Sequence, residues 1–241
     1  MTHAQIFDWW HSLQARLFPP VCWQCDRPSP DDRSPFCNEC TNAWLTDEST
    51  VCPRCASTIG AFTESEEGCK YCREENYHFS SVVRLGPYKE AWRSAALRLK
   101  KAHEETYAHL FAHWWAGKMS PKLPRDCQLV VPVPLHWSRR WERGFNQCHF
   151  LARELARQLK IPESRTLRRK RRSEDQKSLS GTERRKNLKQ AFELHSSISL
   201  KNQKVILVDD VLTTGATADA CSRVLVDAGA TEVIVAIVAK G

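Results

Sequence analysis

The chain has 241 residues, which is enough for one large domain or two smaller ones with a buried core. Its hydrophobic fraction of 41% is ordinary for a globular protein, and no apolar stretch is long enough to span a bilayer. The N-terminal IFDWWHSLQARLF lacks the basic start and clean apolar run of a signal peptide, so we expect a cytoplasmic protein without a transmembrane segment.

Charge is divided unevenly along the chain. Residues 1–79 carry 6 Lys and Arg against 12 Asp and Glu, whereas residues 80–241 carry 30 against 16. Opposite net charges in the two parts indicate two modules with different duties. We therefore predict an N-terminal helix and a cysteine-rich module over 1–79, and a second domain over 80–241.

The first module contains four CxxC pairs. Each CxxC turn places two thiolates on one side of a tight knuckle, and two knuckles complete the tetrahedral shell of a structural Zn²⁺. Disulfides would need an oxidising compartment, and a thioredoxin-like motif would need one CxxC on a βαβ unit. The sequence thus predicts two zinc ions, bound by Cys22, Cys25, Cys37, Cys40, Cys52, Cys55, Cys69 and Cys72. Pairing of successive knuckles closes the shortest loops, and a cross-braced pairing stays open.

From residue 80 onward, strand patterns alternate with helix patterns. Such alternation predicts an α/β domain with a parallel sheet, whose ligands bind at the carboxyl ends of the strands. In chain order we expect a strand and turn (81–88), two amphipathic helices divided near His103 (90–102 and 104–119), a strand entering a loop (127–135), a helix (145–159), a long exposed loop (160–190), a buried strand (204–210), a helix (215–230) and a last strand (231–241). The isolated Cys127, Cys148 and Cys221 are predicted to be core residues.

The stretch VILVDDVLTTGAT places Asp209 and Asp210 at the end of the buried strand, before a turn of small hydroxylated residues and a helix. Backbone N–H groups at a helix start can bind a phosphate, and carboxylates can accept hydrogen bonds from hydroxyls. A ribose 5-phosphate supplies both groups. The alternative, that the acids only cap the following helix, explains one carboxylate better than two. A Walker A lysine and a GxGxxG fingerprint are both absent from the sequence.

This stretch resembles the signature with which type I phosphoribosyltransferases bind 5-phosphoribosyl 1-pyrophosphate (PRPP). Two more segments, VPVPLHWSRRWERGFNQ (131–147) and QKSLSGTERRKNLKQAF (176–192), resemble the VPVP…RxxRGFNQ and QxxLxxxxRxxNxxxAF patterns of the ComF family. Four N-terminal CxxC pairs, forming a double zinc ribbon, are also typical of that family. The resemblance extends from Cys22 to the final strand.

The resemblance implies a phosphoribosyltransferase-like domain with a zinc ribbon, associated in bacteria with natural competence and the uptake or use of external DNA. It implies that PRPP or ribose 5-phosphate binds with Mg²⁺, that Asp209 and Asp210 hold the ribose, and that Arg184 and Arg185 lie in a lid. The implied 5′-phosphate loop is Thr213, Thr214, Gly215, Ala216 and Thr217. The implied pyrophosphate side is Arg140, Arg143, Gly144, Asn146 and Gln147.

Two classes of function fit these residues. As a phosphoribosyltransferase of nucleotide metabolism or salvage, the protein would let a nitrogen nucleophile displace pyrophosphate, with an acceptor that the sequence does not identify. As a DNA-handling protein, it would hold single-stranded DNA, alongside proteins of the uptake machinery. Trp137 and Trp141 would then stack on bases, unless they pack in the core. The predicted contacts to DNA phosphates are Arg168, Arg169, Lys170, Arg171 and Arg172.

Overall fold

A computed structural model describes residues 21–29, 34–45, 49–60, 68–101, 104–135, 144–170, 191–195 and 199–241. The chain divides into two compact units, Met1–Thr46 and Asp47–Gly241. The first unit therefore contains the first two CxxC pairs, and the second unit contains the other two pairs and all the strands of the α/β domain. A functional boundary at residue 79 stays a prediction.

The first unit contains one described helix, α2 (Asn38–Leu45). The Phe36 and Trp44 rings lie against each other, with centroids 4.2 Å apart, and both side chains are buried. A single antiparallel bridge joins Val21 to Pro28 on either side of the first CxxC turn. Among the residues of this unit that the structure describes, the apolar cluster is small, so we expect their fold to depend on the cysteines.

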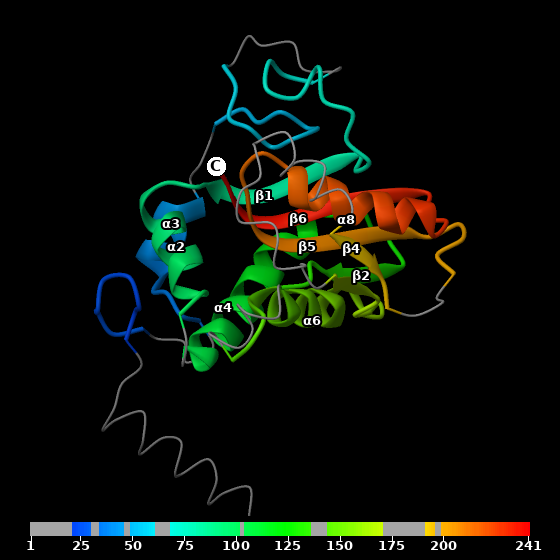
Figure 1. Cartoon of the computed structure of the whole chain (residues 1–241). Helices are drawn as coiled ribbons and strands as arrows, with labels where there is room; N and C mark the ends of the chain where they lie inside the picture. Colours follow the sequence, from blue (N-terminus) through cyan, green and yellow to red (C-terminus); the bar gives the residue numbers. More distant parts are fainter. Residues whose placement is uncertain are drawn as a thin grey trace, which may run out of the picture. The chain divides into compact units, whose positions relative to one another are not determined.

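A four-stranded parallel sheet forms the centre of the second unit (Figure 1). Its strands are β1 (Ser81–Pro87), β2 (Leu129–Pro132), β5 (Lys204–Leu212) and β6 (Glu232–Lys240), in the order β1-β6-β5-β2. Strand β6 is buried along its whole length apart from Glu232, as expected for a strand covered on both faces. The predicted parallel α/β fold is confirmed.

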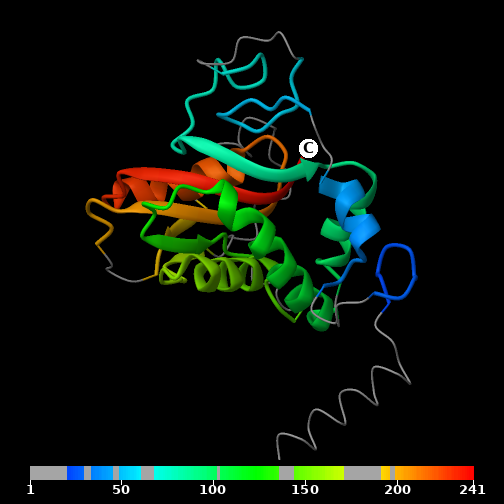
Figure 2. The same cartoon turned by 180° about the vertical axis from the view of Figure 1, so that it is seen from behind.

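Helices cover both faces of this sheet. Figures 1 and 2 show α4 (Glu105–Met119) and α6 (Gln147–Leu159) on one face, and α8 (Ala216–Asp227) on the other. The shorter α3 (Glu90–Arg98) follows β1, and a 3₁₀ turn, η1 (Ser120–Lys122), ends α4. This arrangement leaves the carboxyl ends of the strands accessible to a ligand, as in other α/β folds.

The predicted long loop over 160–190 is wrong in its first part. Strand β3 (Leu167–Arg169) pairs with β4 (Phe192–Leu194) in an antiparallel hairpin. Leu167 and Phe192 are both buried and belong to the main core, so burial of two apolar side chains outweighs the repulsion of the neighbouring cations. Residues 171–190 lie outside the described part of the chain.

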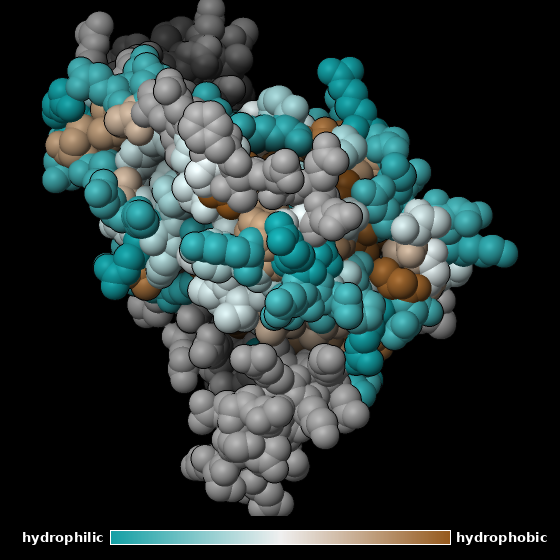
Figure 3. Space-filling view, turned by 90° about the horizontal axis from the view of Figure 1, so that it is seen from above, coloured by the Kyte–Doolittle hydropathy of each residue, from teal (hydrophilic) through white to brown (hydrophobic). Residues whose placement is uncertain are grey.

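Among the helices that the structure describes, none is long and apolar enough to cross a membrane. The face shown in Figure 3 is largely hydrophilic, with apolar residues in small separate patches. Scattered apolar residues of this kind are normal on a protein surface.

Candidate functional site

The eight predicted cysteine ligands form two groups of four. Each group contains two successive CxxC pairs, and within each group the sulfur atoms lie within 4.8 Å of one another. The simpler pairing of successive knuckles is therefore the one observed. The groups are Cys22, Cys25, Cys37 and Cys40 in the first unit, and Cys52, Cys55, Cys69 and Cys72 in the second.

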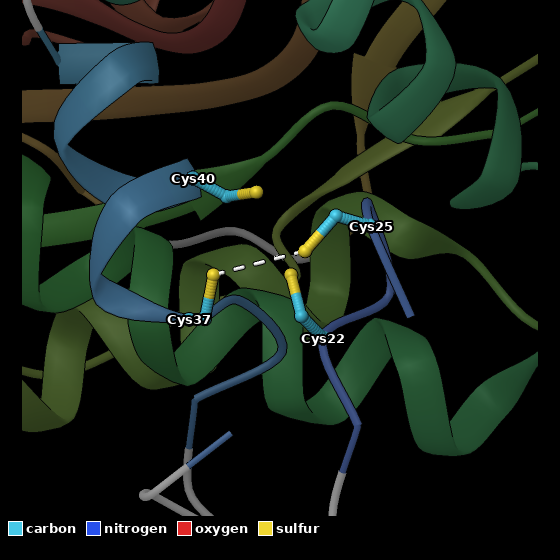
Figure 4. Close-up of side chains that lie close together, drawn as sticks. All are labelled: Cys22, Cys25, Cys37 and Cys40. Atoms are coloured by element: carbon cyan, nitrogen blue, oxygen red, sulfur yellow. Dashed lines mark hydrogen bonds between the residues drawn. The ribbon is translucent and has the colours of Figure 1, made fainter. Parts of the chain in front are cut away.

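The same backbone turn recurs in all four CxxC pairs. The amide of the residue after the second cysteine donates to the carbonyl of the first cysteine, at 2.8–2.9 Å. This turn points both side chains to one side of the chain. In Figure 4 the four side chains of the first group point toward a common centre, two of them from the start of α2 and the residue before it.

The sulfur positions fit a tetrahedral metal ion. The Sγ atoms of Cys52 and Cys72 lie 3.7 Å apart, as do those of Cys55 and Cys69. Four thiolates at about 2.3 Å from a central Zn²⁺ would be separated by about 3.8 Å. All four residues of this second group are buried, which is typical of a closed structural site.

The second cysteine group is joined to the α/β domain by hydrogen bonds and by packing. The buried Arg84 of β1 donates to the Ala56 carbonyl at 2.8 Å and to Thr58 Oγ1 at 2.8 Å. Ala56 itself is 1% exposed and belongs to the main hydrophobic core, as does Phe79. His78 Nδ1 lies 2.8 Å from an Asp219 carboxylate oxygen on α8. The second cysteine group is thus part of the same folded body as the sheet.

The acid pair lies within β5, two residues before its end. The Asp210 carboxyl is buried, and it accepts hydrogen bonds from the Val211 amide at 2.6 Å and from Gln147 Nε2 at 2.7 Å. Asp209 as a whole residue is only partly buried, but its carboxyl group is buried. Burial of the carboxyl raises the pKa of Asp209 to about 7, and the negative charge of Asp210 contributes to that rise. One of the two acids is therefore only partly ionised at neutral pH.

A lysine that the sequence analysis did not single out completes this cluster. Lys100, two residues after the end of α3, places Nζ 3.0 Å from Asp210 Oδ2, and the side chain is 27% exposed. Its positive charge lowers the pKa of Asp209 and so favours the ionised form of that acid, which burial opposes. The adjacent Lys101 has the same residue type, so no local pattern distinguishes the lysine that reaches the site.

The predicted phosphate loop leads directly from β5 into α8. Gly215 is the N-cap of α8 with φ of +83°, a conformation that side chains other than glycine rarely adopt. A Cβ added at Gly215 would also lie 3.2 Å from the Tyr77 ring. Tyr77 donates to the Thr214 carbonyl at 3.0 Å, and Lys240 donates to the Thr213 carbonyl at 2.8 Å. The Ala216 amide at the start of α8 donates to Thr214 Oγ1 over a long 3.4 Å, and a helix start of this kind can bind a phosphate.

The described residues of the predicted pyrophosphate side have structural contacts of their own. Asn146 caps α6 through the Cys148 amide and donates to the Val133 carbonyl of the β2 loop at 3.1 Å. Gln147 donates a hydrogen bond to the Asp210 carboxyl, so the start of α6 is connected to the acid pair. Gly144 has a positive φ of +81° and lines a separate small cavity near Arg165. Their contact with pyrophosphate stays a prediction.

Several predicted site residues fall outside the described part of the chain. These are the pyrophosphate-side Arg140 and Arg143, the lid candidates Arg184 and Arg185, the aromatic Trp137 and Trp141, and Arg171 and Arg172 of the basic run.

The described part of the basic run lies on the β3–β4 hairpin. Arg168 Nε lies 2.8 Å from Glu193 Oε1, and Lys170 Nζ lies 3.4 Å from Glu193 Oε2. The Arg169 guanidinium lies 5.5 Å from the centre of the Phe192 ring. Arg168 and Lys170 therefore share one carboxylate, whereas Arg169 lies against an aromatic ring.

Comparison with known proteins identifies the family. A model of the phosphoribosyl transferase domain matches residues 146–241, which include the acid pair and the phosphate loop. The DNA utilization protein YhgH of Escherichia coli K12 is 30% identical over 220 residues, covering 89% of this chain and 94% of that protein. Competence protein F of Haemophilus influenzae is 31% identical over 191 residues, covering 76% and 81%. This chain belongs to the ComF family.

A more distant ComF relative is competence protein ComFC of Bacillus subtilis, which is 27% identical over 202 residues, or 83% of this chain and 80% of that protein. The ComF resemblance inferred from the sequence motifs is thus confirmed, as is the combination of a phosphoribosyltransferase-type fold with a cysteine-rich N-terminal region.

Proposed function

We propose that this ComF-family chain binds PRPP or ribose 5-phosphate at the carboxyl end of β5 and acts in the uptake or use of external DNA. The observation that carries the proposal is the position of Asp209 and Asp210, which lie on β5 just before the Thr213–Thr217 loop and the start of α8. A strand end with two carboxyls beside a helix start offers acceptors for hydroxyls and donors for a phosphate.

Each part of the ligand has a matching group in the protein. The ribose 2′- and 3′-hydroxyls donate to the carboxylates of Asp209 and Asp210, while the 5′-phosphate accepts from the amides of Gly215, Ala216 and Thr217. Mg²⁺ enters with the pyrophosphate and neutralises part of its charge. A hydroxyl donor favours the ionised form of Asp209, so binding near neutral pH releases a fraction of a proton.

The two cysteine groups fit structural zinc, and we propose Zn²⁺ as the bound metal. Closed Cys₄ shells without an open coordination position contribute folding free energy and take no part in catalysis.

For the DNA-handling role, the support comes from relatives and from charge. Relatives of this length are named as competence and DNA utilization proteins. Residues 80–241 carry 30 Lys and Arg against 16 Asp and Glu, which favours binding of a polyanion. We propose that single-stranded DNA contacts the basic run that begins at Arg168 on the β3–β4 hairpin.

The match to the phosphoribosyl transferase domain favours one second candidate, an active transferase. A nitrogen nucleophile would attack the anomeric carbon, the bond from that carbon to the pyrophosphate oxygen would break, and the nitrogen would lose a proton to solvent. Catalysis would rest on orientation of the two reactants and on neutralisation of the leaving pyrophosphate.

Calorimetry of the full, metal-loaded chain tests the proposal. PRPP with Mg²⁺ is titrated in two buffers of different ionisation enthalpy, with and without short single-stranded DNA. We expect saturable PRPP binding with proton release, and coupling between PRPP and DNA appears as a change in either affinity. Absence of PRPP binding in both buffers would contradict the proposed ligand.

A further inference from the structure

We propose that Tyr77 and Arg54 are positioning residues, through which the geometry of the phosphate loop depends on the metal of the second cysteine group. Because this is the loop to which we assign the 5′-phosphate, the proposal rests on the proposed function. As a consequence, the metal and the 5′-phosphate should each raise the affinity of the protein for the other, since coupling between two binding sites is reciprocal.

Arg54 fastens one turn of the second cysteine group to the segment that follows the other turn. It lies inside the CxxC turn over 52–55, and its guanidinium donates to the carbonyls of Cys72, at 2.8 Å, and of Glu75. The same guanidinium lies 5.7 Å from the centre of the Tyr77 ring. A shift of either turn would therefore move Arg54 relative to Tyr77.

Tyr77 contacts the phosphate loop through both its hydroxyl and its ring. The hydroxyl donates to the Thr214 carbonyl at 3.0 Å, and a Cβ added at Gly215 would lie only 3.2 Å from the ring. The ring is itself stacked on the buried Phe79, with centroids 4.5 Å apart. A ring fixed so close to the backbone limits the conformations open to the loop, so it keeps the amides of the loop oriented for a phosphate.

A second contact joins the same segment to the start of α8. The His78 amide donates to Asp219 Oδ1 at 2.7 Å, and the Asp219 amide donates to the Gly215 carbonyl at 2.8 Å. Tyr77 and His78 follow the last cysteine of the group, Cys72, by five and six positions. The two neighbours thus hold a carbonyl of the loop and the first turn of the helix.

The metal is needed to keep this connection in place. In the described part of the chain, the apolar cluster around the group consists of its four cysteines, with Ile59 and Tyr77 packed against them. Arg84 ties the 52–56 segment to β1, whereas the metal and Arg54 tie the 69–72 turn to that segment. Metal binding therefore supplies folding free energy to the turn that leads to Tyr77.

Three measurements on the full chain test the coupling. Calorimetry gives the affinity of the Zn²⁺-loaded protein and of the metal-stripped protein for ribose 5-phosphate. Competition with a chelator gives the affinity for Zn²⁺, with and without ribose 5-phosphate. Amide exchange is followed at residues 219–222 of α8 and, as an internal reference, at residues 205–208 of β5. In wild type we expect the two affinities to be coupled by one common factor, of about 5- to 150-fold.

Tyr77→Phe removes the hydroxyl and keeps the ring. We expect the loss of one hydrogen bond to make amide exchange at 219–222 about 2- to 10-fold faster and to weaken ribose 5-phosphate binding by a similar factor. Exchange at 205–208 should not change, which separates a local effect on the loop from general destabilisation. Tyr71→Phe is the matched control, because Tyr71 lies in the same cysteine group and is 60% exposed, and it should change neither quantity.

Arg54→Met breaks the connection at its other end. We expect the variant to keep both metals and to exchange faster at 219–222, while ribose 5-phosphate no longer raises its affinity for Zn²⁺. Arg73→Met is the matched control, since Arg73 is an exposed arginine beside Cys72 and should leave the coupling as in wild type.

The outcomes separate this proposal from the proposed function. If wild type does not bind ribose 5-phosphate but Tyr77→Phe still speeds exchange at 219–222 alone, the proposed ligand is wrong and the positioning of the loop stands. If wild type binds ribose 5-phosphate but Tyr77→Phe alters neither exchange nor affinity, the positioning role is overturned and the ligand site stands. A Zn²⁺ affinity that bound ribose 5-phosphate leaves unchanged would overturn the coupling, and failure of both binding and exchange would refute both proposals.

Discussion

The ammonium nitrogen of Lys100 lies 3.0 Å from Oδ2 of Asp210, although 110 positions separate the two residues in the sequence. The lysine comes from the segment after α3, and the acid comes from the interior of the sheet. Their contact gives the acid pair one positive charge before any ligand arrives. This charge compensates in part for placing two adjacent carboxyls at a buried strand end.

Replacement of Lys100 by methionine should destabilise the protein. The variant leaves a largely buried carboxylate without its cation, so we expect a loss of about 1–3 kcal/mol in the free energy of unfolding. Urea denaturation measures this loss. Lys101→Met is the matched control, because Lys101 is the adjacent exposed residue of the same type. Equal effects of both variants would show that the contact with Asp210 contributes nothing.

The double variant Asp209→Asn, Asp210→Asn should abolish PRPP binding while the fold is kept. The amides have nearly the same shape but lose the charge-assisted hydrogen bonds to the ribose hydroxyls, worth about 1.5–3 kcal/mol each. Calorimetry measures the affinity, and circular dichroism checks the fold. Unchanged PRPP affinity would refute the assignment of these two acids.

The single variant Asp209→Asn should change how stability depends on pH. The pKa of Asp209 is raised from 3.8 to about 7, so between these values the unfolded chain loses a proton that the folded chain keeps. Wild-type stability therefore falls as pH rises from about 4 to 7 through this residue, and the full cost remains above pH 7. Asparagine does not titrate, so the free energy of unfolding of the variant, relative to that of wild type, should increase over that interval.

Urea denaturation of both proteins at matched pH values measures the gain. The metal sites respond to pH in the same way in both proteins, so only the difference between them is interpreted. Asp227→Asn, at an exposed position at the end of α8, controls for the loss of one negative charge. A difference that stays constant from pH 4 to 8 would contradict the raised pKa.

Removal of the metals should destabilise the α/β domain as well as the cysteine-rich segments. The second cysteine group is connected to β1 through Arg84, and Tyr77, which packs against the group, is connected to the phosphate loop. If this group unfolds without its metal, both connections are lost. We expect a lower melting temperature on chelation and faster amide exchange at residues 82–85 and 214–219. Cys69→Ser and Cys37→Ser separate the two groups. An equal effect of the two variants would assign the change to metal loss in general.

Replacement of Arg168, Arg169, Lys170, Arg171 and Arg172 by serine should make the binding of single-stranded DNA less sensitive to salt. Each phosphate neutralised contributes a slope of about −0.7, so the loss of three to five contacts flattens the slope by roughly 2 to 3.5. PRPP affinity should change little. Glu193→Gln is the complementary variant, since it releases Arg168 and Lys170 from their shared carboxylate and should strengthen DNA binding. A wild-type salt slope in the serine variant would show that the run only keeps the surface solvated.

The sequence predicts the order of the main strands and helices well, because apolar runs and their periodicity are local signals. The predicted strand over 204–210 is two residues shorter than β5, because Val211 and Leu212 continue the strand by pairing with Ala239 and Lys240 of β6. The acid pair thus lies inside the strand, a result of pairing between distant segments. The β3–β4 hairpin was missed for the same reason: its pairing is visible only once Leu167 and Phe192 share the core.

The candidate site was predictable where its chemistry is local, as in the CxxC pairs and the stretch from Asp209 to Thr217. Lys100, Tyr77 and Lys240 could not be predicted, because each reaches the site from a different part of the sheet or its connections. Their residue types are common at exposed positions, and only the tertiary fold shows that they point inward.

The place of β6 in the sheet sets the order in which the protein can fold during synthesis. Strands β1 and β5 both leave the ribosome before β6, yet each pairs with β6 and not with the other. Until residues 232–240 have emerged, β1 has no neighbour and the apolar edge of β5 is open. The cysteine turns can bind metal early, but β1, which supports the second group through Arg84, gains its neighbour only after β6 has emerged. A chain truncated before β6 would therefore present β1 without its neighbour and one open apolar edge of β5, a state prone to aggregation.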